Sequence, residues 1–380
     1  MQVALDVLTV LAGVVVLGAT SLSVLWTLVV PRATPSRLAE SVVGVVRGTF
    51  LLVARLLPDY RRRDGVLAML PPVALLTLLT VWLTLLTVGF ALLAAPLTTS
   101  GTGATLTSAA TSVLGLEYAD SSTGLQTITL LAVFSGVIVV ALLIGYLPTL
   151  YDAFSSREEL VSLLDSRAGS PAWGVEVLLR ATRDDALADL PTLFGDWERW
   201  AADVGESHSS YPILIFFRSQ DPSRSWVIAL LAVLDAAALH VTLRPDDDTL
   251  AARLCLRTGY MALRSVADTA GIEVDDDPRP EDPIQLSRAE FEAGVQALAA
   301  AGYRPQREVA AAWPHFHGWR VNYEHAAYAL ADRIVAPPAP WSGSRTHLPP
   351  QTLLPHRPPD RRPCHPGEVT GPRRPDAERH

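Results

Sequence analysis

The 380-residue sequence contains no lysine and only two cysteines, and 18% of its residues are charged. All fixed positive charge is therefore arginine, and the net charge of −8 excludes a broadly basic protein that binds nucleic acid. The two cysteines, Cys255 and Cys364, do not make a disulfide framework. Both follow the last predicted membrane span on its cytoplasmic side, so we expect them to stay reduced.

Charges are scarcest in the first 150 residues, where three stretches are long and apolar enough to cross a bilayer. A span needs about 20 mostly apolar residues, and the stretches are Val3–Val30, Val66–Leu97 and Leu125–Leu150. The first has no basic n-region and carries Asp6, so we interpret it as an uncleaved membrane helix, with a cleaved signal peptide as the alternative. Within the second, Pro71-Pro72 is typical of an early helical turn, and we expect regular helix from about Pro71.

Basic residues are also missing between the second and third spans, which fixes the predicted orientation. The connection between the first two spans carries seven arginines: Arg32, Arg37, Arg47, Arg55, Arg61, Arg62 and Arg63. The next connection has only Glu117 and Asp120 as charged residues. The positive-inside rule therefore places the arginines in the cytoplasm. We predict a multi-pass protein of the plasma membrane with its N-terminus outside and its C-terminal part in the cytoplasm.

The segment Thr98–Asp120 interrupts the apolar stretches with small and polar residues, and we interpret it as a re-entrant segment. Backbone leaves helical geometry at membrane depth only where it is buried in protein or lines water. Thr102–Val113 is predicted to form a short helix, and the partial negative charge at its C-terminal end favours a cation. An extracellular loop between two ordinary spans is the alternative. The lack of charge before Glu117 favours the re-entrant interpretation.

A membrane helix, a pore helix, a returning loop and an inner helix in this order resemble the pore module of the potassium channel family, over about Val66–Ser155. The family's filter reads Thr-Thr/Ser-Val-Gly-Tyr-Gly-Asp. The segment that aligns with it is Thr111, Ser112, Val113, Leu114, Gly115, Leu116 and Glu117. Its first three residues match, whereas Leu114 and Leu116 replace the family's glycines. The resemblance therefore implies a degenerate selectivity filter.

A shifted alignment pairs Gly115, Tyr118 and Asp120 with the family's glycine, tyrosine and aspartate but still lacks the second glycine. The resemblance implies a homotetramer in the lipid bilayer that conducts potassium or another monovalent cation, with acidic rings of Glu117 and Asp120 at the outer mouth. It also implies that Gly136 is the hinge of the inner helix, and Gly145 offers a second flexible point.

The fold class predicted for the whole chain is an all-α integral membrane protein with three transmembrane helices, a re-entrant pore helix and loop, and a helical cytoplasmic domain. The predicted parts are an N-terminal transmembrane helix (1–31), a basic amphipathic interfacial segment (32–65), a pore module (66–154), the cytoplasmic domain (155–335) and a disordered tail rich in proline and arginine (336–380). Within the pore module we place the pore helix and loop at 102–120 and the inner helix at 123–154. The interfacial segment contains a predicted helix over Ser36–Leu57, for which packing on the cytoplasmic domain is the alternative to lying on the membrane surface.

The cytoplasmic domain is predicted to be helical throughout, with a short apolar run at Ile213–Phe217 that could be a strand or a buried turn. The predicted helices are Glu158–Arg167, Val175–Thr182, Leu190–Val204, Ser223–Leu243, Thr249–Ala270, Ser287–Ala301 and Arg307–Ile334. Ser287 and Glu290 have the spacing of a capping box. Trp226–Leu243 is apolar enough to be a fourth span. Because it contains Asp235 and His240, we interpret it as a buried core helix in which both side chains have polar partners.

No nucleophile, base and orienting group can be assembled from the sequence, so we expect neither an enzyme nor a cofactor. His315, His317 and His325 do not have zinc-ligand spacing, and we expect aromatic packing rather than a metal there. The predicted function is a potassium-channel-like pore. One alternative is a non-conducting membrane anchor or sensor for the cytoplasmic domain, and another is a protein-interaction module that the membrane part only localises.

Overall fold

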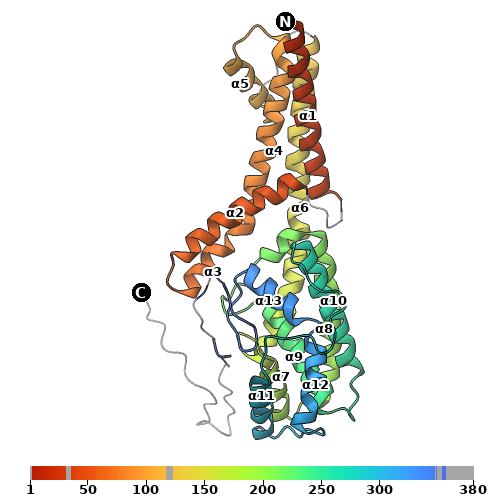
Figure 1. Cartoon of the computed structure of the whole chain (residues 1–380). Coiled ribbons are helices and arrows are strands. Elements are labelled where there is room, and N and C mark those ends of the chain that lie inside the picture. Colours follow the sequence, from red (N-terminus) through yellow and green to blue (C-terminus); the bar gives the residue numbers. More distant parts are fainter. Residues whose placement is uncertain (1, 31–35, 117–122, 347, 349–352, 357–380) are drawn as a thin grey trace. The chain divides into compact units, whose positions relative to one another are not determined.

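The computed structural model describes residues 2–30, 36–116, 123–346, 348 and 353–356. In these ranges the chain forms α-helices and short 3-10 helices and no strand (Figure 1). The first six α-helices are α1 (Gln2–Leu28), α2 (Arg37–Arg55), α3 (Tyr60–Ala68), α4 (Leu70–Ala94), α5 (Thr102–Val113) and α6 (Thr123–Ala168). The others are α7 (Gly174–Arg183), α8 (Leu190–Ser210), α9 (Trp226–Leu243), α10 (Leu250–Thr269), α11 (Arg288–Ala300), α12 (Val309–Arg320) and α13 (Glu324–Arg333).

Four helical stretches in the described part of the chain are long and apolar enough to cross a membrane, which suggests a multi-pass membrane protein. They are Gln2–Leu28, Tyr60–Leu97, Thr123–Ala168 and Trp226–Leu243.

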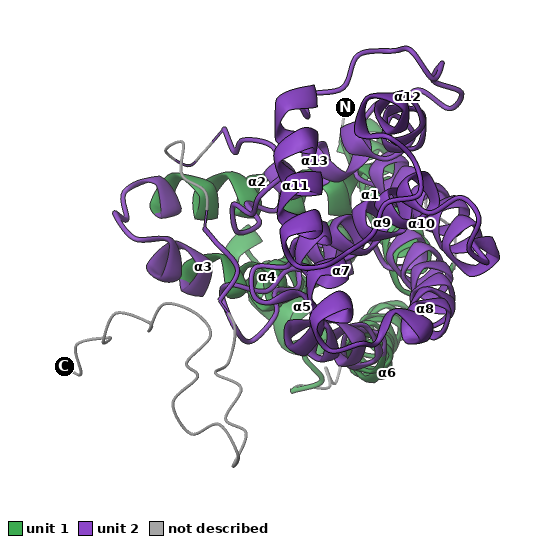
Figure 2. Cartoon of the chain, turned by 90° about the horizontal axis from the view of Figure 1, so that it is seen from below, with its two compact units in different colours: residues 1–53, 66–152 green, residues 54–65, 153–380 purple. Residues whose placement is uncertain are grey.

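The chain divides into two compact units, coloured separately in Figure 2. Unit 1 contains residues 1–53 and 66–152, and unit 2 contains residues 54–65 and 153–380. Helix α6 therefore contributes residues to both units. The short segment 54–65 belongs with the C-terminal part of the chain, whereas we had predicted one membrane-surface segment over 32–65.

In unit 1, α1 packs along α4 through small residues that allow the backbones to approach closely. A Cβ atom added at Gly13 would lie 2.9 Å from the carbonyl oxygen of Gly89. Farther along the same pair, the indole of Trp82 donates a hydrogen bond of 3.0 Å to the Ser23 hydroxyl, which lies 2.6 Å from that of Ser36. Small residues and interhelical hydrogen bonds are the usual means of association for apolar helices in lipid.

In unit 2, α9 is the central helix, and α7, α8, α10, α12 and α13 all contact it (Figure 2). Helix α9 has 18 residues, and 94% of them are buried inside the protein. An apolar helix that protein covers on all sides has no face left for lipid. The structure therefore favours the core-helix interpretation of Trp226–Leu243 over a fourth span.

Several predicted boundaries are confirmed. Helix α5 has the predicted ends, α4 begins with its two prolines in the first turn, and Ser287 and Glu290 form both bonds of the capping box. Ile213–Phe217 lies almost wholly in a 3-10 helix, Pro212–Phe216, and is not a strand.

Other boundaries were wrong. The inner helix does not end at residue 154, because α6 continues without a break to Ala168 and includes the separately predicted helix Glu158–Arg167. The predicted helix Arg307–Ile334 is two helices, α12 and α13. The apolar face of α2 is partly covered by protein: Leu38, Ala39 and Val42 belong to or pack against the core of unit 1. This contact is with unit 1, whereas the alternative that we kept open for that helix was packing on the cytoplasmic domain.

The tail predicted to be disordered from residue 336 is ordered over its first part. Trp341 is buried against Gly294 of α11, and Arg345 is buried among backbone carbonyls, including those of Ala336 at 3.1 Å and Ser342 at 2.7 Å. Burial lowers the pKa of the Arg345 guanidinium to about 10. The proline-rich composition gave no sign of these buried side chains. The prediction for residues 357–380 lies outside the described residues.

Candidate functional site

The site predicted from the sequence lies at the C-terminal end of α5, and the structure describes it as far as Leu116. Helix α5 continues through Thr111, Ser112 and Val113, with Leu114 at the C-cap in right-handed helical geometry. Gly115 then adopts φ = +70°, a left-handed conformation that glycine reaches at little cost.

Two backbone hydrogen bonds close this end of α5. The amide of Leu116 donates to the carbonyl of Thr111, and the amide of Gly115 donates to that of Ser112, both at 2.8 Å. This pair of bonds around a left-handed glycine is a Schellman motif. The two carbonyls are therefore engaged within the helix end, whereas a filter of the potassium-channel type requires an extended backbone with carbonyls turned to the ion. Over these residues the conformation differs from the one that the ungapped alignment implies.

The end of α5 packs against the middle of α6. A Cβ atom added at Gly136 would overlap the carbonyl oxygen of Val113, so only glycine permits this approach. Around the contact, Ala109 of α5 and Ala132 and Val139 of α6 are buried in the core of unit 1. Gly136 is about 20 Å along α6 from its first residue, at about 1.5 Å per residue. The sequence singled out Gly136 as a hinge, and its observed role is close packing inside an unbroken helix.

The remaining predicted site residues are less informative. Nothing lies within 4 Å of a Cβ added at Gly145, and α6 continues through this residue and through Pro148. A hinge at Gly145 stays a prediction. Glu117 and Asp120, together with Tyr118 of the shifted alignment, lie outside the described residues.

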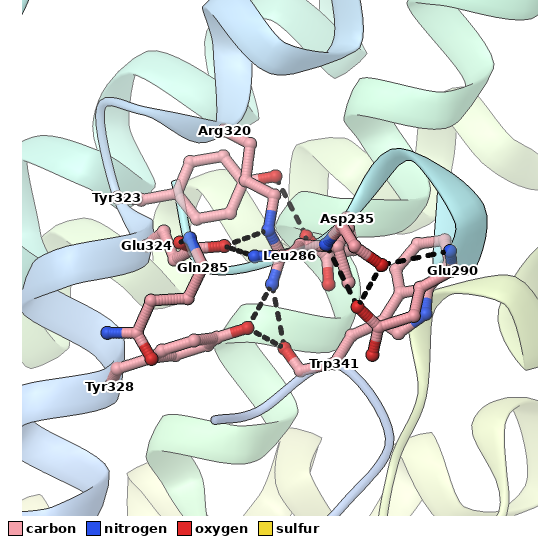
Figure 3. Close-up of polar contacts among 10 residues, drawn as sticks. Asp235, Gln285, Leu286, Glu290, Arg320, Tyr323, Glu324, Tyr328 and Trp341 are labelled. Atoms are coloured by element: carbon pink, nitrogen blue, oxygen red, sulfur yellow. Dashed lines mark hydrogen bonds and ion pairs between the residues drawn. The ribbon is translucent and has the colours of Figure 1, made fainter. Parts of the chain in front are cut away.

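Unit 2 contains a buried network of charged groups centred on Arg320, which the sequence did not reveal (Figure 3). Its guanidinium pairs with Asp235 of α9 and, at 2.6 Å, with Glu324 of α13. It also donates to the Tyr328 hydroxyl and to the Trp341 carbonyl, each at 2.7 Å. Asp235 lowers the free energy of the charged guanidinium and so raises the pKa of Arg320.

Further donors complete this network. The Tyr323 hydroxyl donates to Asp235 at 2.9 Å, and the amides of Gln285 and Leu286 donate to the Glu324 carboxylate. The prediction of a polar partner for Asp235 is thus confirmed, and so is that for His240, whose Nδ1 lies 3.2 Å from the Tyr303 hydroxyl. Because every charge is paired inside the network, we assign it to folding and not to chemistry.

A second buried pair joins the segment 54–65 to the rest of unit 2. Arg218 forms an ion pair with Asp64, and both side chains are less than 10% exposed. The same guanidinium donates to the Tyr60 hydroxyl at 2.9 Å and to the carbonyl of Val335 at 3.0 Å. We had interpreted the arginines beside Asp64 only as an orientation signal. The one available hint was that Asp64 is an acidic residue directly after Arg61–Arg63.

A third polar cluster surrounds Arg157, in the part of α6 that belongs to unit 2. Its guanidinium lies 3.1 Å from His208 Nε2 and donates to the carbonyls of Leu214 and Phe217 at 3.1 and 2.9 Å. Glu158 pairs with it at 2.8 Å. Burial, and secondarily the charge of Arg157, hold the pKa of His208 well below its usual value.

Among the residues that the structure describes, no group of histidine, cysteine, aspartate and glutamate side chains could hold a metal ion. His317 instead bonds the Pro280 carbonyl at 2.7 Å and lies beside the Trp313 ring, with 5.5 Å between ring centroids.

Comparison of the chain with protein-family models, with curated proteins and with solved structures finds no match. The resemblance to potassium channels therefore rests on the order of the helices and on the residues named above.

Proposed function

We propose that this chain is one subunit of an oligomeric membrane pore for monovalent cations, potassium being the first candidate. The observation that carries the proposal is the contact between Val113 at the end of α5 and Gly136 in the middle of α6. Because the bilayer's hydrocarbon core is about 30 Å thick, a short helix that reaches about 20 Å along a spanning helix ends at membrane depth. Such a position suits a re-entrant helix better than an external loop.

The C-terminal end of α5 would supply the electrostatic part of this function. Partial negative charge from its last carbonyls favours a cation near Leu114 and Gly115. The carbonyls of Thr111 and Ser112 already accept backbone hydrogen bonds, so we place the ion path after the helix rather than along Thr111–Val113. Glu117 and Asp120 follow directly in the sequence and are the candidate acidic residues of the outer mouth. In this proposal four copies surround the pore, the N-terminus is outside, and the helical domain of unit 2 is cytoplasmic.

The capped end of α5 favours a second candidate, a non-conducting membrane anchor or sensor. A helix whose end is closed by a Schellman motif offers fewer free carbonyls to an ion than an extended filter does. In this case the re-entrant helix would only stabilise the membrane bundle.

An ion flux assay separates the two candidates. We expect purified protein in liposomes to release potassium, and Glu117→Gln to reduce the flux or change the selectivity among monovalent cations because it removes an acidic ring. Glu159→Gln, at an exposed residue of unit 2, serves as the control. Absence of flux over a range of voltage and pH, together with a monomer in detergent, would reject the pore and favour the anchor.

A further inference from the structure

Unit 1 contains a cavity of about 120 Å³ between α5 and the two helices α4 and α6. Its apolar lining residues include Phe90 of α4 and Ile128 of α6. Its hydroxyl-bearing lining residues include Thr105, Ser108 and Ser112 of α5 and Thr129 of α6. The described residues of the lining are all uncharged.

The Thr129 hydroxyl has no hydrogen-bond partner among the described residues, although the side chain is 95% buried. Other threonines of α4 and α6 do have a hydrogen-bond partner. Thr127 of α6 donates to the carbonyl four residues before it, and so do all four threonines of α4: Thr77, Thr80, Thr84 and Thr87. The Thr129 oxygen is not among the fully enclosed polar atoms of the described residues, so a molecule in the cavity can reach it. Such a molecule would supply the hydrogen bond that the protein does not.

We propose that this cavity binds a small neutral amphiphile, a molecule with one hydroxyl group and a short apolar body. The hydroxyl of the ligand would bond Thr129, and its apolar part would lie against Phe90 and Ile128. The size follows from the volume. A cavity of about 150 Å³ holds benzene, so one of 120 Å³ suits about five non-hydrogen atoms. The uncharged lining excludes carboxylates and amines, since burying an unpaired charge is far more costly than burying a hydroxyl.

The position of the cavity gives binding a structural consequence. The ligand would contact α5 on one side and α4 and α6 on the other, and would therefore stabilise the docking of α5. This holds whether or not the chain conducts ions, so the inference does not depend on the proposed function.

The test uses full-length protein in detergent and 3-bromopropan-1-ol, which has five non-hydrogen atoms, with binding followed by saturation-transfer NMR. We expect Thr129→Val to weaken binding about five- to tenfold, the loss of one hydrogen bond. Thr127→Val is the matched control, because its hydroxyl is exposed and bonded within the helix; it should bind as the wild type does. Ala104→Leu, at an exposed residue of the lining, should fill the cavity and abolish binding.

A second probe isolates the hydroxyl. 1-Bromobutane replaces it with a methyl group, so it should bind more weakly than the alcohol and show no difference between the wild type and Thr129→Val. Thermal unfolding of each variant confirms that it is folded. If all four proteins bind the alcohol equally, the signal is partition into detergent and the proposal is wrong. It is equally wrong if neither probe binds the wild type, in which case water alone satisfies Thr129.

Discussion

Each of the two units of this protein is stabilised by a different kind of interaction. Unit 1 relies on close approach of helices at glycine, as at Gly13 and Gly136, and on a few hydroxyl and indole hydrogen bonds. Unit 2 buries ion pairs instead, centred on Arg320, Arg218 and Arg157. The difference teaches where each unit is vulnerable. Added volume should damage unit 1, whereas removal of one charge should damage unit 2.

The largest effect is expected from Arg320→Met, which leaves Asp235 and Glu324 buried without their cation. Breaking a buried ion pair by removing one partner costs about 3–5 kcal/mol, so the free energy of unfolding of unit 2 should fall by at least this amount. Denaturant unfolding followed by near-ultraviolet circular dichroism measures it. The control is Arg288→Met, whose exposed pair with Glu292 should contribute less than about 0.5 kcal/mol. Similar losses in both variants would contradict the role given to burial.

A somewhat smaller loss is expected from Asp64→Asn, which keeps the shape of the side chain but leaves Arg218 without its counter-charge. We expect about 3 kcal/mol, within the range for a broken buried pair. The segment 54–65 should also detach more often, so trypsin should cleave faster at Arg61, Arg62 and Arg63. Asp59→Asn, at an exposed residue of the same segment, should leave the cleavage rate unchanged. No change with Asp64→Asn would show that the segment does not depend on the ion pair.

In unit 1 the corresponding test adds a single methyl group. Gly136→Ala places a Cβ on the Val113 carbonyl and should reduce the free energy of unfolding by about 1–3 kcal/mol, the usual cost of overpacking. In Gly145→Ala the added Cβ has no neighbouring atom within 4 Å. This change should stabilise α6 by up to about 1 kcal/mol, because alanine is the better helix former. Thermal unfolding in detergent ranks the two variants by stability. If Gly136→Ala is as stable as Gly145→Ala, α5 is not docked on α6 as described.

The smallest effect on stability is expected from protonation of His208. Its pKa in the folded protein is held well below the value of about 6.5 that an unfolded chain shows. As pH falls below about 6.5, the unfolded state takes up the proton first, and stability should decrease by at most about 1.4 kcal/mol per pH unit from this group. His208→Gln should flatten the dependence of unfolding free energy on pH between 7 and 5.5, and His325→Gln, with its exposed side chain, should not. An unchanged slope in His208→Gln would assign the acid sensitivity elsewhere.

Local signals explain what the sequence predicted well. Thr102–Val113 was recognisable because this uncharged run of small residues between two apolar stretches is long enough for about three helical turns. Ser287 and Glu290 were recognisable because a capping box needs contacts only three residues apart. The ungapped alignment with the filter was misleading over Thr111–Val113, which end the predicted helix, because an alignment transfers residue types but not the hydrogen bonds that end a helix.

Long-range contacts explain what was missed. Asp235 and Arg320 are 85 residues apart in sequence, and Arg218 lies 154 residues from Asp64. No periodicity links such partners, so their charges were interpreted separately. Asp235 was interpreted as a costly residue in an apolar helix, and the arginines beside Asp64 as an orientation signal. The burial of Trp341 was missed for the same reason, since it packs against Gly294 of α11. Arg345 instead bonds carbonyls within nine residues of itself, such as those of Ala336 and Ser342, and no sequence pattern marks such contacts.

The pair of Asp64 and Arg218 also has a consequence for synthesis. Tyr60 and Asp64 leave the ribosome before α4, α5 and α6, yet their partners Arg218 and Val335 are translated only afterwards. Unit 2 therefore cannot close until the remaining helices of unit 1 have been made. During that interval the Tyr60 and Asp64 side chains lack the partners that they contact in the folded unit.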